Sequence, residues 1–569
     1  MSVKRFSFLI GLAFFVLALR LFQLQIIQGK KFFQLSQANS IRIQRIQGSR
    51  GKILDRYGNI LVDNTFSYDL LVYPQAIENP ESFLKTISSI LEIPLTELKS
   101  RFYSQTGGSS LPITLVKDLD KQRAIILEEL KMKFPAIAIQ TVPKRFYPYG
   151  RLASHILGYL ASIDYWRLNI WQDYGYSFQD IVGFGGVEER YDYYLKPEDG
   201  GIQLEVDNRG RIIRILGFKP SRSGKDIYLT IDLRIQKIVE EALSEYAGAV
   251  VIMEPFSGEI IAMASSPDFS PYDCSYNQSI LKKIISQKQA PLVNRAISGL
   301  YPPGSIFKPV VAVAGLQNKK INLKTTFFCA GSLKIGNRQF GCWDKHGAQN
   351  LFWAIVHSCD VFFYKVGLSL GVDKISEYAL KFGLGKATYV DLPEEKTGFV
   401  PHPLLRKKEK RQNWFEGDTA NFSIGQGELL TTPLQIVRMI SVFANKGKLV
   451  RPYVVKSIDN KDISLRQRRI ISLPIEESIL NTINQAMEAV VSNPEGTAHI
   501  LNISGLSIAG KTGTAQVAKA QPHAWFAGFF PKDNPRYSIC VLLEHGGSSA
   551  NACLVAKKII ERIKEESLL

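Results

Sequence analysis

The feature that most constrains this chain is an uncharged apolar run near its N-terminus, Phe6–Leu19. Arg20 interrupts the run, and a second apolar stretch follows, so the whole segment covers residues 6–27. Such a segment is long enough to cross a bilayer if Arg20 extends its charged end to an interface. Residues 1–5 carry two basic side chains, which place this tail in the cytoplasm. We therefore expect one transmembrane segment, with nearly all of the following chain outside the cytoplasm.

A cleaved signal peptide is the competing interpretation of the same run. Its apolar core would fit, but no A-x-A-like cleavage site follows, because the next residues are QLQIIQGKK. We therefore predict an uncleaved signal anchor. The sequence contains no second run of about 18 apolar residues, so we expect a single pass.

Composition narrows the class of protein. The chain has 569 residues, of which 45% are hydrophobic, and a formal net charge of +18. These values are typical of globular domains rather than of disordered or fibrous chains. The positive balance favours anionic surroundings. We expect no nucleic acid partner, because the sequence lacks zinc-finger pairing and an RNP-like aromatic string.

The pattern of expected elements changes at a polar linker, Ser221–Asp226. Before it, residues 28–48 are compatible with a helix, and later segments alternate between helical and strand-like patterns. After it, the pattern predicts an amphipathic helix over residues 233–247, a β-hairpin over residues 247–266, helices, three further strands and a last helix. This order predicts an α+β fold, an antiparallel sheet with helices on its faces, rather than alternating βαβ units.

A candidate nucleophile lies in the segment Ser305-Ile306-Phe307-Lys308. If a helix begins at Ser305, its side chain and that of Lys308 share one face, and Pro309 falls in the first turn, where its missing N–H is not needed. A serine hydroxyl is a weak nucleophile and needs an adjacent base. A lysine can be that base if burial or a neighbouring cation lowers its pKa. The helix N-terminus would also favour negative charge near Ser305.

Two short patterns occur more than once, so neither is specific alone. The S-x-x-K pattern recurs at Ser49–Lys52, in a turn region, and at Ser82–Lys85, where we expect a solvated helix face. The Lys-Thr-Gly pattern occurs at Lys511–Thr514, in a strand-like run, and at Lys396–Gly398, between prolines. A strand at Lys511 can present a backbone N–H to an oxyanion and a cation to a carboxylate.

The ordered set of Ser305 with Lys308, then Ser358-Cys359-Asp360, then Lys511-Thr512-Gly513 is far more specific than any member. Such a set is typical of penicillin-binding proteins and class A β-lactamases. With the segments RGKILDRYGNILVDN, GFGGVEERYD, NRAISGLYPPGSIFKP and FSIGQGELLTTPLQ, the chain resembles a class B penicillin-binding protein from Gly48 almost to the C-terminus. Asp360 stands where the family usually has Asn, which favours the elongation-type (rod-shape) branch, often called penicillin-binding protein 2.

The resemblance implies a domain organisation and a setting. It implies a cytoplasmic tail (1–5), a transmembrane anchor (6–27), an elongated mixed α/β pedestal (28–222) and a penicillin-binding transpeptidase domain (223–569) of serine β-lactamase-like fold. The catalytic domain would lie on the outer side of the bacterial cytoplasmic membrane. The implied partners are a SEDS-family, RodA-type glycosyltransferase and other proteins of the elongation complex.

The resemblance also implies a D,D-transpeptidase mechanism without a cofactor. Ser305 attacks the penultimate D-Ala carbonyl of a donor stem peptide, Lys308 accepts its proton, and Ser358 relays a proton toward the leaving D-Ala. Asp360 can pair with a motif lysine. The terminal carboxylate is bound by Lys511, Thr512 and Thr514, around Gly513, and the oxyanion by the backbone N–H groups of Ser305 and Thr514. An acceptor amine then attacks the acyl-enzyme; water would give a carboxypeptidase side activity. β-Lactams acylate Ser305.

Two other functions stay open at this point. A β-lactam sensor or β-lactamase would share the motifs, but residues 28–222 and the anchor argue against a plain lactamase, and the sequence shows no deacylating base. A non-catalytic scaffold of the wall-synthesis complex would not need the intact motifs.

Four residues suggest a metal site: Cys329, Cys342, His346 and Cys359, with 12, 3 and 12 residues between them. Three thiolates and an imidazole suit a closed tetrahedral zinc site, which would be structural. Two alternatives stay open, a disulfide between Cys329 and Cys342, or unlinked apolar cysteines. Elongation-type relatives show a similar pattern around their second motif, and Cys359 lies inside that motif.

Overall fold

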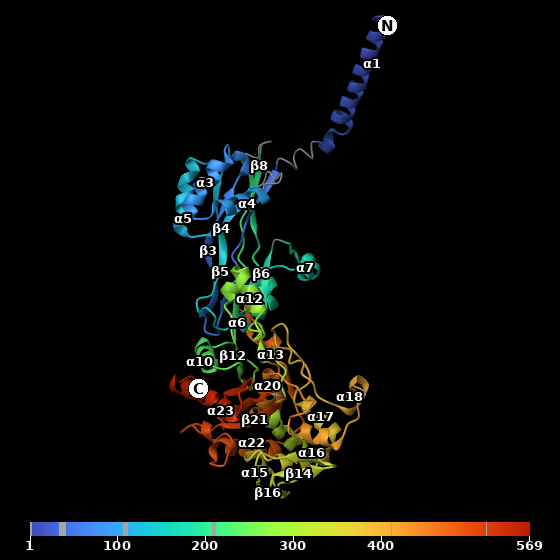
Figure 1. The fold of residues 1–569 in the computed structure, drawn as a ribbon, viewed down its shortest axis with the longest axis vertical. Coiled ribbons are helices and arrows are strands. Elements are labelled where there is room, and N and C mark those ends of the chain that lie inside the picture. The colour runs from blue at the N-terminus through green and yellow to red at the C-terminus, as the bar shows by residue number, and fades with distance from the viewer. Residues whose placement is uncertain are drawn as a thin grey trace. The chain divides into compact units, whose positions relative to one another are not determined.

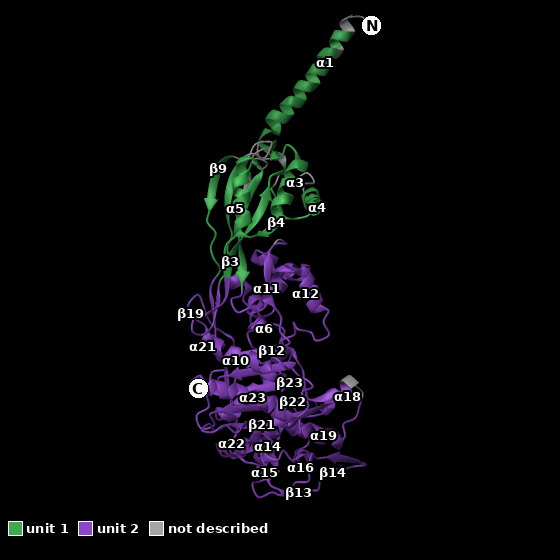
Figure 2. Cartoon of the chain, turned by 60° about the vertical axis from the view of Figure 1, so that its left-hand side comes forward, with its two compact units in different colours: residues 1–51, 64–146, 196–224 green, residues 52–63, 147–195, 225–569 purple. Residues whose placement is uncertain are grey.

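The computed structural model describes residues 3–32, 41–105, 112–178, 180–206, 212–410, 412–518 and 520–569. It forms two compact units, coloured separately in Figure 2. Unit 1 comprises residues 1–51, 64–146 and 196–224, and unit 2 comprises residues 52–63, 147–195 and 225–569.

The N-terminal apolar run is helical, as predicted. Helix α1 (Val3–Phe22) continues into a π-helical turn, η1 (Gln23–Ile27). Over Phe6–Ile27 the mean hydropathy is 2.1, and within the described part of the chain this is the one helix long and apolar enough to cross a membrane. Length and composition therefore fit a single membrane pass.

The expectation of a helix over residues 28–48 is wrong at its C-terminal end. Residues 29–32 are helical and residues 33–40 lie outside the described residues, but β1 (Ile41–Ile46) is a strand. Its sequence, IRIQRI, begins with the period-two alternation of a strand. β1 pairs antiparallel with β8 (Gly200–Val206), which also pairs with β9 (Ile212–Lys219).

The rest of unit 1 packs helices on a sheet. The central strand β3 (Ile60–Val72) pairs with β4 (Ile113–Leu119) and β5 (Ile137–Phe146). The covering helices are α3 (Pro80–Leu91), α4 (Leu95–Gln105) and α5 (Lys121–Glu129). Helix α3 is amphipathic: Asn79 caps it, and it buries Phe83, Leu84, Ile87 and Leu91 in the unit's core.

Unit 2 is built on a five-stranded antiparallel sheet. Its order is β12 (Ile260–Ser266), β11 (Gly248–Met253), β23 (Tyr537–Leu543), β22 (Ala520–Phe530) and β21 (Ala509–Val517). The predicted hairpin is β11–β12, with Val250 opposite Ala264. The strand β21, which carries Lys511, lies at the edge of this sheet.

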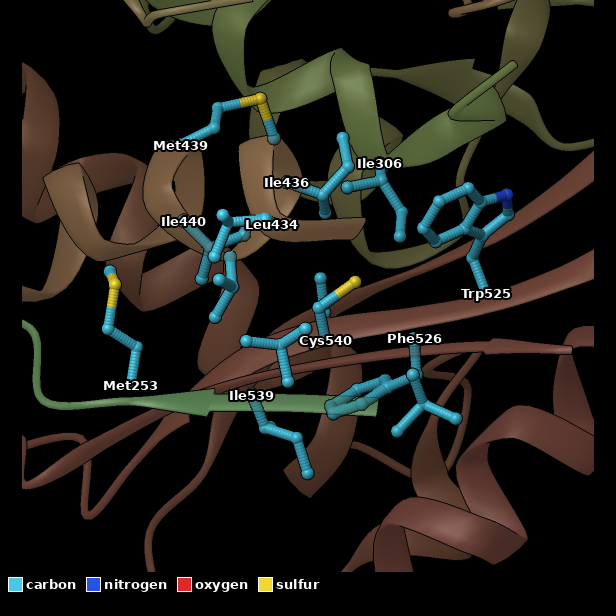
Figure 3. Close-up of a cluster of buried hydrophobic side chains, with 14 of the residues drawn as sticks. Met253, Ile306, Leu434, Ile436, Met439, Ile440, Trp525, Phe526, Ile539 and Cys540 are labelled. Atoms are coloured by element: carbon cyan, nitrogen blue, oxygen red, sulfur yellow. The ribbon is translucent and has the colours of Figure 1, made fainter. Parts of the chain in front are cut away.

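Helices cover both faces of this sheet. Successive residues of each strand point to opposite faces, so each strand contributes side chains to both contacts. Helix α20 (Pro433–Ala444) brings Leu434 and Ile436 to the face that bears Cys540, whereas the adjacent Ile539 points the other way (Figure 3). The helices α10 (Leu233–Leu243) and α23 (Ser549–Glu565) contact each other and the sheet. The predicted antiparallel α+β domain with helices on both faces is confirmed.

The remaining elements of unit 2 follow the chain as shown in Figure 1. β10 (Ile227–Leu229) joins β2 (Ile53–Leu54) to β18 (Val455–Ile458). Residues 147–195 contribute α6 (Ser154–Leu157), β6 (Tyr159–Ser162), α7 (Tyr165–Trp171), β7 (Ile181–Phe184), α8 (Gly186–Arg190) and α9 (Asp192–Leu195). The middle of the chain contributes α14 (Lys308–Gln317), α15 (Leu351–Val356), α16 (Asp360–Leu370), α17 (Val372–Lys381), α19 (Glu416–Ser423) and α22 (Glu477–Ser492).

Candidate active site

The candidate nucleophile lies in a tight turn. Ser305 belongs to a 3₁₀ turn, η5 (Gly304–Phe307), and α14 begins only at Lys308, whose N–H donates to the Ser305 carbonyl. The expectation that Ser305 caps an α-helix is therefore wrong. The prediction that Ser305 and Lys308 share a face does not depend on it, because side chains three residues apart eclipse in a 3₁₀ turn. Pro309 is in the first turn of α14, as expected.

Close backbone contacts hold this turn in place. The Gly304 N–H donates to the Gly425 carbonyl at 2.9 Å. Gly304 has φ +57°, and a Cβ on it would lie 3.0 Å from the Thr514 carbonyl oxygen. A Cβ on Gly513 would lie 2.8 Å from the Pro303 carbonyl oxygen. Pro303 and Gly304, the two residues before Ser305, therefore pack directly on the strand that carries the third motif.

Lys308 joins the first motif to the second. Its ammonium is fully buried and donates to the Ser358 carbonyl at 2.7 Å, to Ser358 Oγ at 3.1 Å and to Asp360 Oδ1 at 2.7 Å. An ammonium has three donors, so these three contacts account for its hydrogen-bonding capacity. Asp360 supplies the opposite charge that a buried lysine requires.

Ser358 is held in an unusual conformation. It lies between α15 and α16 with φ +54°, the left-handed region that residues other than glycine rarely adopt. Such a conformation persists where the surroundings fix it, and it is frequent at functional sites. It aims both the carbonyl and the hydroxyl of Ser358 at Lys308. Asp360 opens α16, where the helix dipole favours its negative charge.

The third motif provides a second buried lysine. Lys511 is fully buried on β21, and burial together with the neighbouring Lys308 holds its pKa well below the usual range, although Asp360 opposes this shift. Thr512 is almost completely buried, whereas Thr514 is exposed. The strand therefore places a lysine, two hydroxyls and a backbone edge next to the Ser305 turn.

The four predicted metal ligands come together. Cys329 ends β13 (Phe327–Cys329), His346 precedes β16 (Gly347–Gln349), and the ligand atoms of the set all lie within 4.8 Å of one another. His346 Nδ1 lies 3.6 Å from Cys329 Sγ and 3.5 Å from Cys342 Sγ. Tetrahedral zinc with sulfur and nitrogen ligands sets neighbouring donors about 3.5–3.8 Å apart, so this donor set fits zinc. All six cysteines, which lie within the described ranges, are free, so the disulfide alternative is not formed.

One cysteine of this cluster also accepts a hydrogen bond from the second motif. The Asp360 N–H donates to Cys342 Sγ at 3.2 Å. The Cys359 thiol and the backbone N–H groups of Asp344, Val361 and Asp360 hold the pKa of Cys342 below its usual range, although burial opposes this shift. A thiolate is the form that binds a metal. The geometry therefore joins a metal-competent thiolate to the start of α16.

Two family models match the sequence along most of its length. The penicillin-binding protein transpeptidase domain matches residues 248–565, and the penicillin-binding protein dimerisation domain matches residues 45–229. The chain belongs to the penicillin-binding protein transpeptidase family. The resemblance predicted from the motifs is thereby confirmed.

Named relatives specify the branch. The chain is 32% identical to the peptidoglycan D,D-transpeptidase MrdA of Acinetobacter baumannii, over 98% of this chain and 87% of that one. It is similar to the penicillin-binding protein PBP2 of Helicobacter pylori, solved in complex with MreC, at a TM-score of 0.82, 28% identity and coverage of 93% and 99%. A peptidoglycan synthase complex described as coordinating polymerization and crosslinking is similar at a TM-score of 0.74, 27% identity and coverage of 98% and 97%. The elongation-type assignment is confirmed.

The structure of this penicillin-binding protein separates the true motifs from their duplicates. Ser82 and Lys85 lie on the exposed side of α3, in unit 1, as expected of a solvated helix face. Lys396–Gly398 lies in a loop, where the Thr397 carbonyl accepts a hydrogen bond from Gln435. Neither Ser82–Lys85 nor Lys396–Gly398 contributes to the hydrogen bonds of the Lys308 ammonium.

Sequence reasoning missed several residues that pack around the three motifs. Tyr301 exchanges backbone hydrogen bonds with Thr431, Trp525 donates to the Pro302 carbonyl at 3.1 Å, and Thr497 Oγ1 lies 2.8 Å from Thr512 Oγ1. The G-Q-G segment contributes to the family resemblance, but its packing on Gly304 follows only from the fold. Thr497 has no sequence signal of its own, because its partner lies 15 residues away on another element.

Proposed function

We propose that this chain cross-links peptidoglycan stem peptides during lateral cell-wall elongation, through an acyl-enzyme on Ser305 and with release of terminal D-Ala. The observation that best supports this proposal is the convergence of the motifs on Lys308. The Lys308 ammonium donates to Ser358 and Asp360. Lys308 itself directly follows the 3₁₀ turn that contains Ser305, and it is a neighbour of the buried Lys511.

In the acylation step, Ser305 Oγ forms a bond to the penultimate D-Ala carbonyl carbon while its proton passes to the Lys308 amine. Lys308 must therefore be a neutral amine before attack, because only an unprotonated amine can accept the Ser305 proton. The backbone N–H groups of Ser305 and Thr514 bind the oxyanion. The peptide C–N bond then breaks, and Ser358 passes a proton to the leaving D-Ala nitrogen.

The substrate carboxylate is bound by Lys511, Thr512 and Thr514, around Gly513. Gly513 leaves no space for a side chain, so substrate and nucleophile turn can both approach the strand. An acceptor amine next attacks the ester of Ser305 and regenerates its hydroxyl. Water in place of the amine gives a carboxypeptidase side activity. A β-lactam acylates Ser305 in place of the donor peptide.

We assign residues 1–5 to the cytoplasm, 6–27 to the membrane, 28–222 to the pedestal and 223–569 to the transpeptidase domain on the outer side of the cytoplasmic membrane. Lys4 and Arg5 support this orientation, since basic residues favour the cytoplasmic side. The Helicobacter pylori relative forms a complex with MreC, and a further relative belongs to a synthase complex. We infer elongation-complex partners for this chain, among them a SEDS-family, RodA-type glycosyltransferase.

We assign a structural zinc ion to Cys329, Cys342, His346 and Cys359. Four protein ligands leave no open position, so the ion would support the loop before α16 rather than take part in catalysis. Metal analysis of the full-length protein should give about one zinc per chain. His346→Ala should lose the zinc and lower thermal stability, whereas His402→Ala, a half-exposed histidine paired with Asp373, should retain both. Wild-type protein without zinc would contradict the assignment.

The proposed function is tested by intact-mass spectrometry of the detergent-solubilised full-length protein after benzylpenicillin. We expect one stable adduct on the wild type and none on Ser305→Ala. Ser82→Ala removes the serine of the duplicate S-x-x-K pattern and should keep the adduct. Steady hydrolysis with a transient adduct would indicate a β-lactamase, and a folded protein without any adduct would favour a scaffold.

A further inference from the structure

A short segment between α22 and the 3₁₀ turn η6 (His499–Leu501) contacts both the second and the third motif. Its contacts come from Glu495 and Thr497. Glu495 Oε2 lies 3.0 Å from His357 Nε2, directly before Ser358. Thr497 Oγ1 lies 2.8 Å from Thr512 Oγ1 on β21. The segment therefore lies where the two motifs meet.

The backbone of Thr497 is fixed as well as its side chain. Its N–H donates to the Val356 carbonyl at 3.4 Å, at the end of α15. The Ala498 N–H donates to the Val490 carbonyl of α22 at 3.0 Å. These contacts hold the Thr497 hydroxyl against Thr512 from elements that belong to neither motif.

The chemistry of the two hydroxyls determines which of them donates in the hydrogen bond between Thr497 and Thr512. Each hydroxyl has one proton to donate and two lone pairs that accept. A substrate carboxylate only accepts, so when Thr512 binds one it must donate its single proton to it. The contact of 2.8 Å then persists only with Thr497 as the donor and Thr512 Oγ1 as the acceptor. Accepting a hydrogen bond also strengthens a hydroxyl as a donor.

We propose that Thr497 is a positioning residue whose hydroxyl donates to Thr512 Oγ1 and so directs the Thr512 proton to the terminal carboxylate of the donor peptide. The proposal rests on the proposed function, because it requires a carboxylate at Thr512. Thr512 is almost completely buried, so a misdirected proton would leave the carboxylate facing a lone pair rather than a donor.

The test compares acylation of the full-length protein in detergent by benzylpenicillin and by its methyl ester, which lacks the charged carboxylate. Thr497→Val keeps the shape of the side chain and removes the hydroxyl. The second-order acylation rate with benzylpenicillin should fall about tenfold, the effect of one hydrogen bond to a charged group. With the methyl ester, wild type and variant should differ less than about twofold. Thr497→Ser restores the hydroxyl and should bring the benzylpenicillin rate back near that of the wild type.

An equal loss with both compounds would overturn the proposal, because it would show that Thr497 only shapes the site. No loss with either compound would overturn it too. If Thr497→Val does not fold, Thr497→Ala is measured with the same pair of compounds. Failure of the proposed function is a separate result: the wild type itself would then form no adduct on Ser305.

Discussion

The indole Nε1 of Trp525 donates a hydrogen bond to the Pro302 carbonyl oxygen at 3.1 Å. Trp525 is fully buried on β22, where it pairs in register with Gly513 on β21. One side chain thus contacts the turn before Ser305 and also supports the strand of the third motif. The separation between the Ser305 turn and the strand of the third motif therefore depends on this indole.

Trp525→Phe tests that dependence. The substitution leaves the Pro302 carbonyl without its donor, and an unpaired buried acceptor costs about 1–3 kcal/mol. We expect a lower thermal midpoint and an acylation rate by benzylpenicillin reduced about tenfold, because displaced reacting groups lose rate steeply. Trp166→Phe on the exposed side of α7 is the control and should change neither value. Unchanged acylation in Trp525→Phe would show that the turn holds its position without the indole.

A comparison of Gly304→Ala with Gly336→Ala separates the effect of a close contact with Thr514 from the effect of a left-handed backbone. Gly304 has φ +57° and a Cβ on it would lie only 3.0 Å from the Thr514 carbonyl oxygen, whereas Gly336 has φ +58° with open space around it. Both substitutions carry the same left-handed penalty of about 1–2 kcal/mol. Only Gly304→Ala should displace the Ser305 turn, so its acylation rate should fall about 100-fold while that of Gly336→Ala stays near wild type. Equal rates in the two variants would contradict a steric requirement at Gly304.

The sequence allowed the sheet, the two motif lysines and the metal-ligand set to be predicted, because each leaves a local signal. Lys511 could be preferred over Lys396 from strand-like neighbours alone. Two predictions failed where distant contacts decide the backbone. β1 is a strand because Ile41 pairs with Glu205, and Ser305 lies in a 3₁₀ turn because Gly304 packs on Gly425 and Thr514. Thr497 could not be found for the same reason, since only the fold brings it to Thr512.

Glu240 on α10 should make stability depend on pH. Burial raises the pKa of its carboxyl to about 7, although Gln236 Nε2 and the Ala153 N–H both donate to it. The unfolded chain ionises glutamate near pH 4.3, so the folded state binds this proton more tightly. The stability from Glu240 is therefore fully present below about pH 4 and is lost as pH rises through about 7, by about 4 kcal/mol in total.

Thermal midpoints of the full-length protein in detergent, measured from pH 5 to pH 8, check this dependence. Glu240→Gln cannot ionise and should show a smaller fall across that range, with a midpoint above that of the wild type at pH 8. Glu241→Gln, on the exposed side of the same helix, should follow the wild-type profile. A Glu240→Gln profile parallel to the wild type would show that another group controls the dependence.

We expect the main role of Asp360 to be electrostatic: its carboxylate neutralises the buried Lys308 ammonium. Asp360→Ala leaves the Lys308 ammonium buried beside Lys511 without an anion, and breaking a buried pair from one side costs about 3 kcal/mol or more. Asp360→Asn keeps an acceptor oxygen for Lys308 Nζ and removes only the charge. We expect Asp360→Ala to lower the thermal midpoint and abolish acylation, and Asp360→Asn to retain the adduct on Ser305. Thermal unfolding and intact-mass spectrometry on the same preparations separate the two effects. If Asp360→Ala were as stable and as reactive as wild type, Lys308 would not need Asp360, and the Ser358 contacts alone would hold it.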